Sequence, residues 1–279
     1  MVVDVHAHLL DHHTDMDESF LSATGHSKTG GVDLTSRWEK YEAAAPDGTM
    51  AIVFGGKARL SGLWVDDTKV AAFAAQHPDS VIGFMGIDPT QPGWQDEMVY
   101  AHRELGLRGI KIMPMYAGFD PTSPEFDPLW TYASQNGLPI LSHTGTTFVA
   151  QAVLDYARPG LFDNVARRFP DLKLILAHLG HPYEGECLAT IRKHPNVYAD
   201  LSALHYRPFQ LWHSLRLAQD YGVTHKILFG SDFPFTTVQD SIDGLRALTE
   251  VEITGLPRLD PVLVEAIIDR DALELLGLR

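Results

Sequence analysis

The chain has 279 residues, of which 45% are hydrophobic and 21% charged, a balance typical of a folded protein and not of a disordered one. Asp and Glu outnumber Lys and Arg by 36 to 22, so the formal net charge of −14 disfavours binding to nucleic acid or to an anionic membrane surface. The single cysteine, Cys187, excludes an internal disulfide and a cysteine-rich zinc site, and no apolar stretch approaches the roughly 20 residues of a membrane span.

Eight short runs of aliphatic and β-branched residues recur along the chain and predict strands. The first begins at once, without the basic lead of a signal peptide, so we expect a cytoplasmic protein. The runs are nearly continuously apolar, as is typical of strands buried on both faces of a parallel sheet. In chain order they are Val2–His6, Thr49–Phe54, Val81–Ile87, Leu107–Ile112, Leu138–Ser142, Leu172–Ala177, Val197–Leu201 and Lys226–Phe229.

Stretches with helical spacing separate these strands, and several end in a stop signal such as Asn136-Gly or Tyr221-Gly. They are Asp67–Gln76, Gln95–Leu105, Pro128–Asn136, Val149–Phe169, Glu184–Lys193, Phe209–Tyr221 and Val238–Leu248. The alternation of strands and helices predicts repeated βαβ units with an all-parallel sheet. No linker divides the chain, so we expect one domain over residues 1–279.

Two segments depart from this alternation. Residues 9–47 are too long for a simple connection between a strand and a helix, so we expect an irregular flap followed by a helix near Leu34–Ala44. Residues 261–279 are expected to close the domain with one or two helices over Pro261–Leu276.

The polar residues that indicate chemistry lie where the predicted strands end. His6 and His8 end the first strand and share a face, because alternate strand residues point to the same side. His143 ends the fifth strand, His178 the sixth and Asp232 the eighth. The C-terminal strand ends of a parallel barrel form its active-site face. Imidazoles and a carboxylate that converge there predict an open, catalytic metal site with a position left for water.

Such a metal site in turn favours a closed (β/α)8 barrel. Strands of an open sheet are about 4.8 Å apart, which would leave the first and eighth strands tens of Å from each other. Their side chains could not then share a metal through bonds of roughly 2.0–2.2 Å.

Several charged residues near the site leave alternatives open. Lys57 and Arg59 follow the second strand, where they would bind an anion, lie in a solvated loop, or pair with the nearby Asp66, Asp67 and Asp120. Lys111, near the end of the fourth strand, is a candidate for carbamylation between two metals, for binding a substrate carboxylate, or for a buried ion pair. Asp4 shares the strand parity of the first two histidines, so it is either an acceptor beneath the metal or a polar residue of the barrel floor.

Other common catalytic signatures are absent from the sequence. The lysine of Phe-Gly-Gly-Lys belongs to no phosphate loop, and no G-x-G-x-x-G follows a strand. No G-x-S-x-G elbow marks a serine hydrolase.

Three segments resemble the amidohydrolase superfamily: Val-Asp-Val-His-Ala-His, Leu-Pro-Ile-Leu-Ser-His-Thr-Gly and Ile-Leu-Phe-Gly-Ser-Asp-Phe-Pro. The closer resemblance is to the amidohydrolase-related branch of aminocarboxymuconate-semialdehyde decarboxylase, resorcylate decarboxylases and related hydratases and carbon–carbon hydrolases. It covers essentially the whole chain, although the chain is shorter than many decarboxylases of this branch.

The resemblance implies a distorted (β/α)8 barrel with one divalent metal, which we expect to be zinc, with manganese as the alternative. It assigns His178 as the acid/base residue. Because it implies a single metal, we expect Lys111 not to be carbamylated as a bridge between two metals. The metal ligands that it assigns are His6, His8, His143 and Asp232.

Three functions fit these residues. We favour a decarboxylase of a small unsaturated or aromatic carboxylic acid. The second is a hydrolase of an amide, lactone or carbon–carbon bond at the same metal, with Asp232 as a further catalytic residue. The third is an inactive barrel that serves as a binding protein. The expected partners are a small carboxylate bound by Arg59 and Lys111 and, in a homodimer, a second copy of the chain.

Overall fold

Eight parallel strands form one sheet in the computed structural model, which describes residues 1–24 and 33–279. Each of the eight predicted strands is present, with a shift of a few residues at some ends. In spatial order the strands are β1 (Val3–His8), β2 (Met50–Phe54), β5 (Val81–Ile87), β6 (Ile110–Ile112), β7 (Ile140–Ser142), β8 (Leu174–Leu176), β9 (Val197–Asp200) and β10 (Ile227–Leu228).

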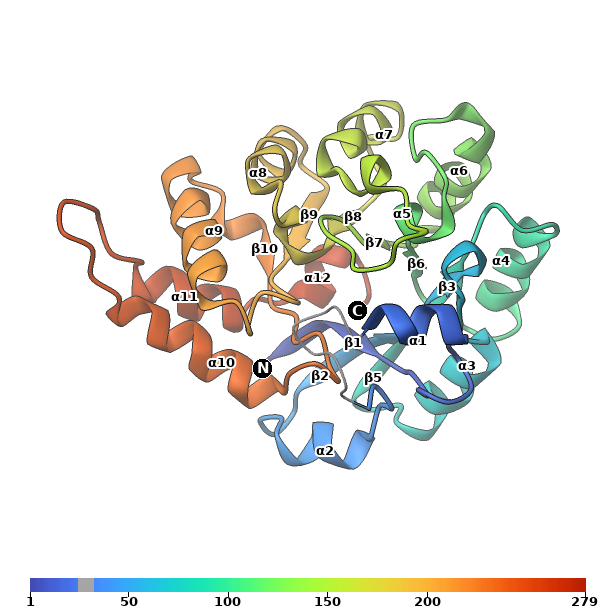
Figure 1. Ribbon diagram of the computed structural model, residues 1–279, viewed down its shortest axis with the longest axis horizontal. Helices are drawn as coiled ribbons and strands as arrows, with labels where there is room; N and C mark the ends of the chain where they lie inside the picture. The colour runs from blue at the N-terminus through green and yellow to red at the C-terminus, as the bar shows by residue number, and fades with distance from the viewer. Residues whose placement is uncertain (25–32) are drawn as a thin grey trace.

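The first and last strands of this order close the sheet into a barrel. The amide of Val5 donates to the carbonyl oxygen of Phe229 over 3.0 Å, and the amide of Asp232 donates to the carbonyl oxygen of His6 over 2.9 Å. The chain therefore forms a (β/α)8 barrel of the TIM type, with helices around its outside (Figure 1).

The outer helices follow the predicted spacing closely. Asp66 and Thr237 cap two of them, since each side chain accepts a hydrogen bond from a backbone amide of the first turn. Gly137 and Gly222 end two others in the left-handed conformation that glycine favours. The helices are α3 (Asp67–Gln76), α4 (Trp94–Arg103), α6 (Asp127–Asn136), α7 (Phe162–Arg168), α8 (Glu184–Lys193), α9 (Pro208–Tyr221) and α10 (Val238–Ala247).

One predicted helix is wrong over most of its length. The stretch Val149–Phe169 forms an α-helix only in α7, and 3-10 turns at Leu154–Ala157 and Pro159–Leu161 precede it. Pro159 has no amide hydrogen and its ring clashes with the preceding turn of a helix, so a continuous helix cannot pass through it.

The two irregular segments and three short elements complete the fold. The flap contains α1 (Glu18–Thr24), which the sequence did not predict, and α2 (Trp38–Ala43), which it did; residues 25–32 of the flap lie outside the described residues. The closing segment forms the two expected helices. The remaining elements are the unpredicted hairpin of β3 (Lys57–Ala58) with β4 (Leu63–Trp64), the short helix α5 (Pro114–Ala117), and the closing helices α11 (Pro261–Ile268) and α12 (Ala272–Leu276).

Two apolar clusters fill most of the fold. The larger cluster joins the strands to the outer helices. The smaller one contains strand residues such as Val5 and Ile175 together with Leu273 and Leu276 of α12. Helix α12 thus packs against the lower barrel residues, and buried polar side chains gather at the C-terminal ends of the strands.

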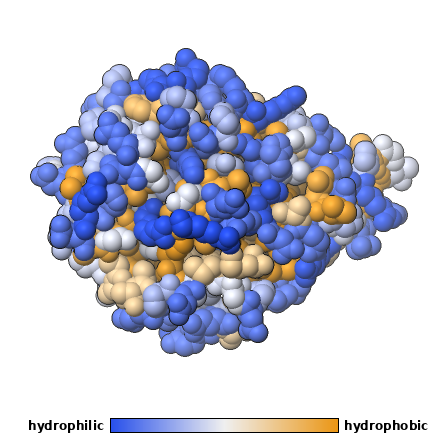
Figure 2. All heavy atoms as spheres, turned by 180° about the vertical axis from the view of Figure 1, so that it is seen from behind, coloured by the Kyte–Doolittle hydropathy of each residue, from blue (hydrophilic) through white to orange (hydrophobic). Residues whose placement is uncertain are grey.

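The surface identifies no docking site by itself. Seen from behind, it is mostly hydrophilic, with hydrophobic residues spread across its centre (Figure 2). Scattered exposed apolar residues are normal on folded proteins. No helix in the described part of the chain is long and apolar enough to cross a membrane.

Candidate metal centre

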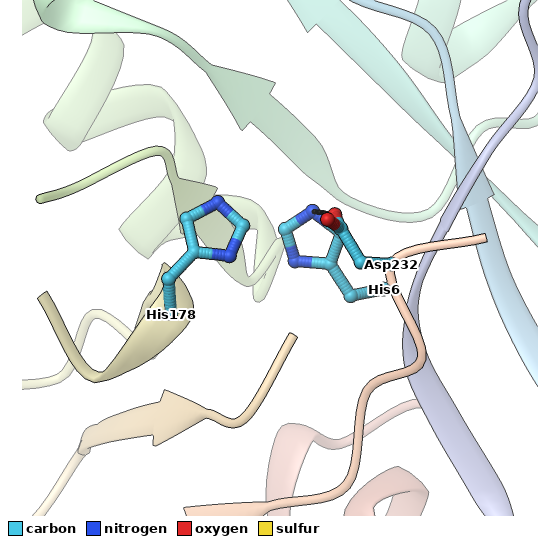
Figure 3. Close-up of side chains that lie close together, drawn as sticks. All are labelled: His6, His178 and Asp232. Carbon is cyan, nitrogen blue, oxygen red and sulfur yellow. Dashed lines mark ion pairs between the residues drawn. The ribbon is translucent and has the colours of Figure 1, made fainter. Parts of the chain in front are cut away.

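The barrel brings together the five residues that the sequence analysis selected. The ring centroid of His6 lies 5.1 Å from that of His8 and 4.9 Å from that of His178, and the centroids of His143 and His178 are 4.7 Å apart. The Oδ1 atom of Asp232 lies 3.5 Å from His6 Nε2 and 3.3 Å from His8 Nε2. Figure 3 shows His178 and Asp232 approaching His6 from different elements.

The backbone adopts a left-handed conformation at four non-glycine residues around this cluster. The φ angles are 62° at His178, 48° at Leu179, 59° at Ala203 and 65° at Asp232, all after strands β8 to β10. This conformation is unfavourable for residues with a Cβ atom, and such strain is concentrated at functional sites. The strain therefore marks the same end of the barrel as the histidines.

Backbone carbonyl groups fix the tautomers of His143 and His178. The Nε2 atom of His143 lies 3.1 Å from the carbonyl oxygen of Thr146, and His178 Nδ1 lies 3.0 Å from that of Ser202. A carbonyl oxygen only accepts, so each of these nitrogens carries the hydrogen and the other ring nitrogen carries a lone pair. Those two nitrogens, His143 Nδ1 and His178 Nε2, are 3.2 Å apart. Two lone pairs that face each other require a shared proton or a cation beside them.

His6 presents a third lone pair to the same space. Its Nδ1 atom lies 2.9 Å from Asp200 Oδ2, and a carboxylate accepts, so Nδ1 carries the hydrogen. Its Nε2 atom is buried and has no hydrogen-bond partner among the described residues. Buried polar atoms without a partner are rare, and an unplaced ion is one explanation for them.

These donors fit a divalent metal ion. Ligand atoms of His6, His178 and Asp232 all lie within 4.8 Å of one another. Imidazole nitrogens and a carboxylate suit zinc and also accept manganese. The grouping includes His178, the expected proton carrier, so the geometry alone does not separate its role from that of a ligand.

Burial sets the protonation state of the site. It lowers the pKa values of His6, His143 and His178 well below the usual range, so these rings are neutral, the form that binds metals. Burial alone would raise the pKa of Asp232, but the hydrogen bond from His8 and the attraction of His6 and His8 outweigh it. The net effect is a lowered pKa, so Asp232 is ionised.

Lys111 lies in the barrel wall on β6 and lacks a partner. Its Nζ atom is buried, has no hydrogen-bond partner within the described chain, and lies 4.6 Å from the ring centroid of Phe54. Burial lowers its pKa to about 7, although Asp200 and Asp232 oppose the shift. The interpretation of Lys111 as a member of a buried ion pair is therefore wrong.

A cavity of about 870 Å³, including its open mouth, lies over the cluster. Flap residues form part of its apolar wall, which faces the polar cluster; ligand sites commonly combine such a wall with a few polar groups. The apolar and aromatic lining is Leu10, Met16, Phe20, Leu34, Leu63, Met113, Tyr116, Phe148, Ala203, Tyr206 and Phe235. The other lining residues are His8, His143, Thr146, Thr147, His178, His181, Arg207 and Asp232.

Of the alternatives left open for Lys57, the structure shows the ion pair with an aspartate. Lys57 is buried and pairs with Asp67 over 2.7 Å and with Glu97 over 2.6 Å. Arg59 stacks its guanidinium 3.9 Å from the ring centroid of Trp64. Neither of these cations nor Lys111 is among the described residues that line the cavity.

The sequence analysis missed two candidate functional residues, and both lie at or just after the C-terminal end of β9. Arg207 lines the cavity from the loop after β9, and Asp200, the last residue of β9, contacts the His6 ring. Asp4, by contrast, binds Ser231 and Tyr41 rather than the His6 ring. A register shift between Asp4 and Ala7 interrupts the regular pairing of β1 with β2, so shared strand parity does not carry over to the His6 ring, and the alternative of Asp4 as an acceptor beneath the metal is wrong.

Comparisons with known proteins agree with the fold and give the family. A family model described as Amidohydrolase matches residues 3–278, and a search of curated proteins found no match. Among solved structures, an uncharacterized TIM-barrel protein from Bordetella bronchiseptica has a TM-score of 0.75 at 18% identity, covering 99% of this chain and 98% of that one.

Two further structures carry named activities. A probable 2-pyrone-4,6-dicarboxylic acid hydrolase from Acinetobacter baumannii, with citric acid bound, has a TM-score of 0.67 at 15% identity and covers 99% of each chain. A 5-carboxyvanillate decarboxylase from Novosphingobium aromaticivorans, with bound manganese, has a TM-score of 0.68 at 15% identity and covers 100% of this chain and 97% of that one. At these identities the likeness shows the fold alone.

Proposed function

Because the chain belongs to the amidohydrolase family, we propose that it is a divalent-metal-dependent enzyme with one metal ion at the strand-end cluster. The observation that carries this proposal is that His6, His178 and Asp232 offer ligand atoms within 4.8 Å of one another, while the buried Nε2 of His6 has no hydrogen-bond partner among the described residues. Zinc is the favoured ion and manganese the alternative. The proposed metal ligands are His6, His8, His143 and Asp232.

We propose decarboxylation of a small unsaturated or aromatic acid as the reaction. The apolar wall of the cavity suits the hydrocarbon part of such an acid, and a decarboxylase of a substituted benzoic acid is among the structural neighbours. Hydrolysis of a lactone, amide or carbon–carbon bond is the second candidate, supported by the likeness to the probable hydrolase. A bound divalent ion would polarise a substrate oxygen in either reaction and lower the pKa of a bound water.

His178 is the proposed proton carrier. Its Nδ1 hydrogen is held by the carbonyl oxygen of Ser202, so any proton that it exchanges with substrate is at Nε2. His178 is a lining residue of the cavity, and its Nε2 atom faces His143 Nδ1, which belongs to another lining residue. In decarboxylation, Nε2, which carries a lone pair in the neutral ring, would first take up a proton from water and then deliver it to the carbon that loses carbon dioxide. In hydrolysis, Nε2 or the Asp232 carboxylate would take the proton of the attacking water.

Arg207 is the best placed residue to bind the substrate carboxylate. It is the one Lys or Arg side chain among the described residues that line the cavity, and its guanidinium donates to the carbonyl oxygen of Ala203 and lies over the Tyr206 ring. A guanidinium binds a carboxylate through paired hydrogen bonds. Local positive charge would also recruit an acid to a protein whose net charge is −14. The earlier assignment of Arg59 and Lys111 requires a rearrangement that brings them to the cavity.

A substrate screen tests the reaction. Aromatic and muconate-type acids, amides and lactones are offered to zinc-loaded and manganese-loaded protein, with chelator-treated protein as the control. Carbon dioxide release and hydrolytic product are followed in parallel. We expect metal-dependent carbon dioxide release from an acid. Turnover of lactones or amides without carbon dioxide release from any acid would contradict decarboxylation and support hydrolysis.

A further inference from the structure

The carboxylate of Asp200 sits beneath two of the site histidines and is fully buried. Its Oδ2 atom accepts from His6 Nδ1 over 2.9 Å. Its Oδ1 atom accepts from the backbone amides of His178 and Ser202, each over 3.0 Å, and also from the Ser202 hydroxyl. The two oxygens therefore have different tasks: Oδ1 is held by the backbone, and Oδ2 faces a ring.

The Ser202 hydroxyl extends this contact to the second ring. Its oxygen lies 2.9 Å from His6 Nδ1 and 2.8 Å from His178 Nδ1. Because its single hydrogen is donated to Asp200, the oxygen can only accept from the two rings. Asp200 and Ser202 together thus surround both Nδ1 atoms with acceptors.

We propose that Asp200 is a positioning residue that holds His6 in the Nδ1–H tautomer, so that Nε2 keeps its lone pair for the metal. The tautomer is a property of the metal-free protein, while its consequence for metal binding rests on the proposed function. Nothing in this role requires Asp200 to touch the metal or the substrate.

A purely structural role would use only half of the carboxylate. Oδ1 alone anchors the turn after β8 and the turn after β9, through the amides of His178 and Ser202. The approach of Oδ2 to the His6 ring adds nothing to that anchoring. It does decide which nitrogen of His6 carries the hydrogen.

The Asp200→Asn variant separates the two roles. Two backbone amides and a hydroxyl donate to the Oδ1 position, so the amide oxygen of asparagine must occupy it. The NH₂ group then takes the place of Oδ2 and offers a hydrogen to His6 Nδ1. His6 must accept through Nδ1 and move its own hydrogen to Nε2, which removes the lone pair from the metal site. The same logic applies to the carboxylate that orients the histidine of a catalytic triad.

Asp4→Asn is the matched control. Asp4 is equally buried and accepts from the backbone amide of His6, but its other oxygen binds the hydroxyls of Ser231 and Tyr41. Hydroxyl groups can turn and accept from an amide. The control therefore changes the same atoms next to the same residue without changing the tautomer of the ring.

The tautomer is read from ¹⁵N–¹H correlation spectra of metal-free protein labelled in the histidine rings, with the His6 signals identified by their loss in His6→Gln. We expect Nδ1–H in the wild type and in Asp4→Asn, and Nε2–H in Asp200→Asn. Zinc affinity, measured by competition with a chelating dye, should fall about 10–100-fold in Asp200→Asn, the usual scale for a group that orients a metal-bound histidine. It should change less than threefold in Asp4→Asn.

Several results would overturn the proposal. A wild-type His6 found as Nε2–H is sufficient, and it can be observed even if Asp200→Asn does not fold. An Asp200→Asn protein that keeps Nδ1–H, or that switches tautomer without losing zinc affinity, also contradicts it. If the wild type binds neither zinc nor manganese while Asp200→Asn still switches the tautomer, the proposed function fails and the tautomer assignment of Asp200 stands.

Discussion

Two buried lysines of this barrel have opposite surroundings. Lys57 is 2% exposed, and its ammonium contacts Asp67 and Glu97, while the other oxygen of Asp67 accepts from the amide of Gly86 over 2.8 Å. Lys111 is 1% exposed, and its Nζ atom has no hydrogen-bond partner in the described chain.

The difference distinguishes a structural cluster from a functional one. The cluster around Lys57 satisfies its own charges, so it needs nothing from outside. The cluster around Lys111 contains His6 with an unpartnered nitrogen and two facing lone pairs on His143 and His178. Several such groups gathered at one place fit a ligand that the chain itself does not supply. The predictions below test this contrast.

Removal of the His178 ring should have the largest effect. His178→Ala is expected to lower turnover by about 10²–10⁴-fold while most of the metal is retained, because general acid–base catalysis contributes on that scale. Turnover and metal content are measured on the same preparation. Loss of the metal together with the side chain would show that His178 is a ligand instead.

Removal of the Lys57 ammonium should destabilise the fold and leave the metal in place. Lys57→Met leaves Asp67 buried without its cation, which costs about 3–5 kcal/mol for a broken buried pair. Chemical denaturation measures the loss. Lys193→Met is the matched control, because Lys193 pairs with Asp163 at the exposed surface, where such a pair contributes about 0–1 kcal/mol. Equal effects of the two substitutions would contradict the distinction.

Acidification should lower the folding stability contributed by the buried histidines and raise the stability contributed by Asp67 of the Lys57 cluster. His6, His143 and His178 have folded pKa values well below 6.5, so only the unfolded chain takes up their protons just below that pH. Their contribution to stability is complete above pH 6.5 and is lost as the pH falls, by up to about 1.4 kcal/mol per unit for each ring. Burial raises the pKa of Asp67 from 3.8 to about 6, so its contribution is present below 3.8 and lost as the pH rises through 6.

The histidines outnumber the opposing groups, so the net effect has a definite direction. Asp4, whose pKa burial also raises to about 6, joins Asp67 on the opposing side. We expect metal-free protein to unfold at a lower denaturant concentration at pH 5.5 than at pH 7, and His143→Gln to show a smaller difference. A stability that rises on acidification would refute the assignment of neutral histidines.

Replacement of Lys111 should have the smallest effect on the fold. Lys111→Met fills the same space and leaves no hydrogen-bond partner unsatisfied, so we expect a change in unfolding free energy of less than about 1 kcal/mol or a gain. A loss as large as that of Lys57→Met would show that the two lysines do not differ as described. Electron density in a crystal structure would show a carboxylated Lys111, which we expect to be absent.

The strand ends were the part of the molecule that the sequence predicted best. Continuous apolar runs identified the eight strands, and the requirement that His6 and Asp232 share a site led to the closed barrel. These inferences succeeded because parallel strands place their C-terminal ends together whatever the loops do. The set of site residues predicted from the sequence was incomplete. Asp200 ends β9 and Arg207 follows it, but no motif distinguished either residue from ordinary loop residues.

Loops and local irregularities account for the errors. Pro159 prevents the continuous helix that periodicity predicted through it, and a shift of register in β1 rules out one of the two alternatives for Asp4, that of an acceptor for the His6 ring. The partner of Lys57 depends on α4, which contributes Glu97 from 40 residues away. Such pairings depend on tertiary packing, which sequence spacing does not encode.

Elemental analysis tests the central claim most directly. Protein purified without added metal, then dialysed against zinc and washed, should contain about one divalent ion per chain. His6→Ala and Asp232→Ala should contain much less, while Lys57→Met should match the wild type. A wild-type protein that retains no divalent ion, or variants of His6 and Asp232 that retain as much as the wild type, would contradict the assignment of the strand-end cluster as a metal site.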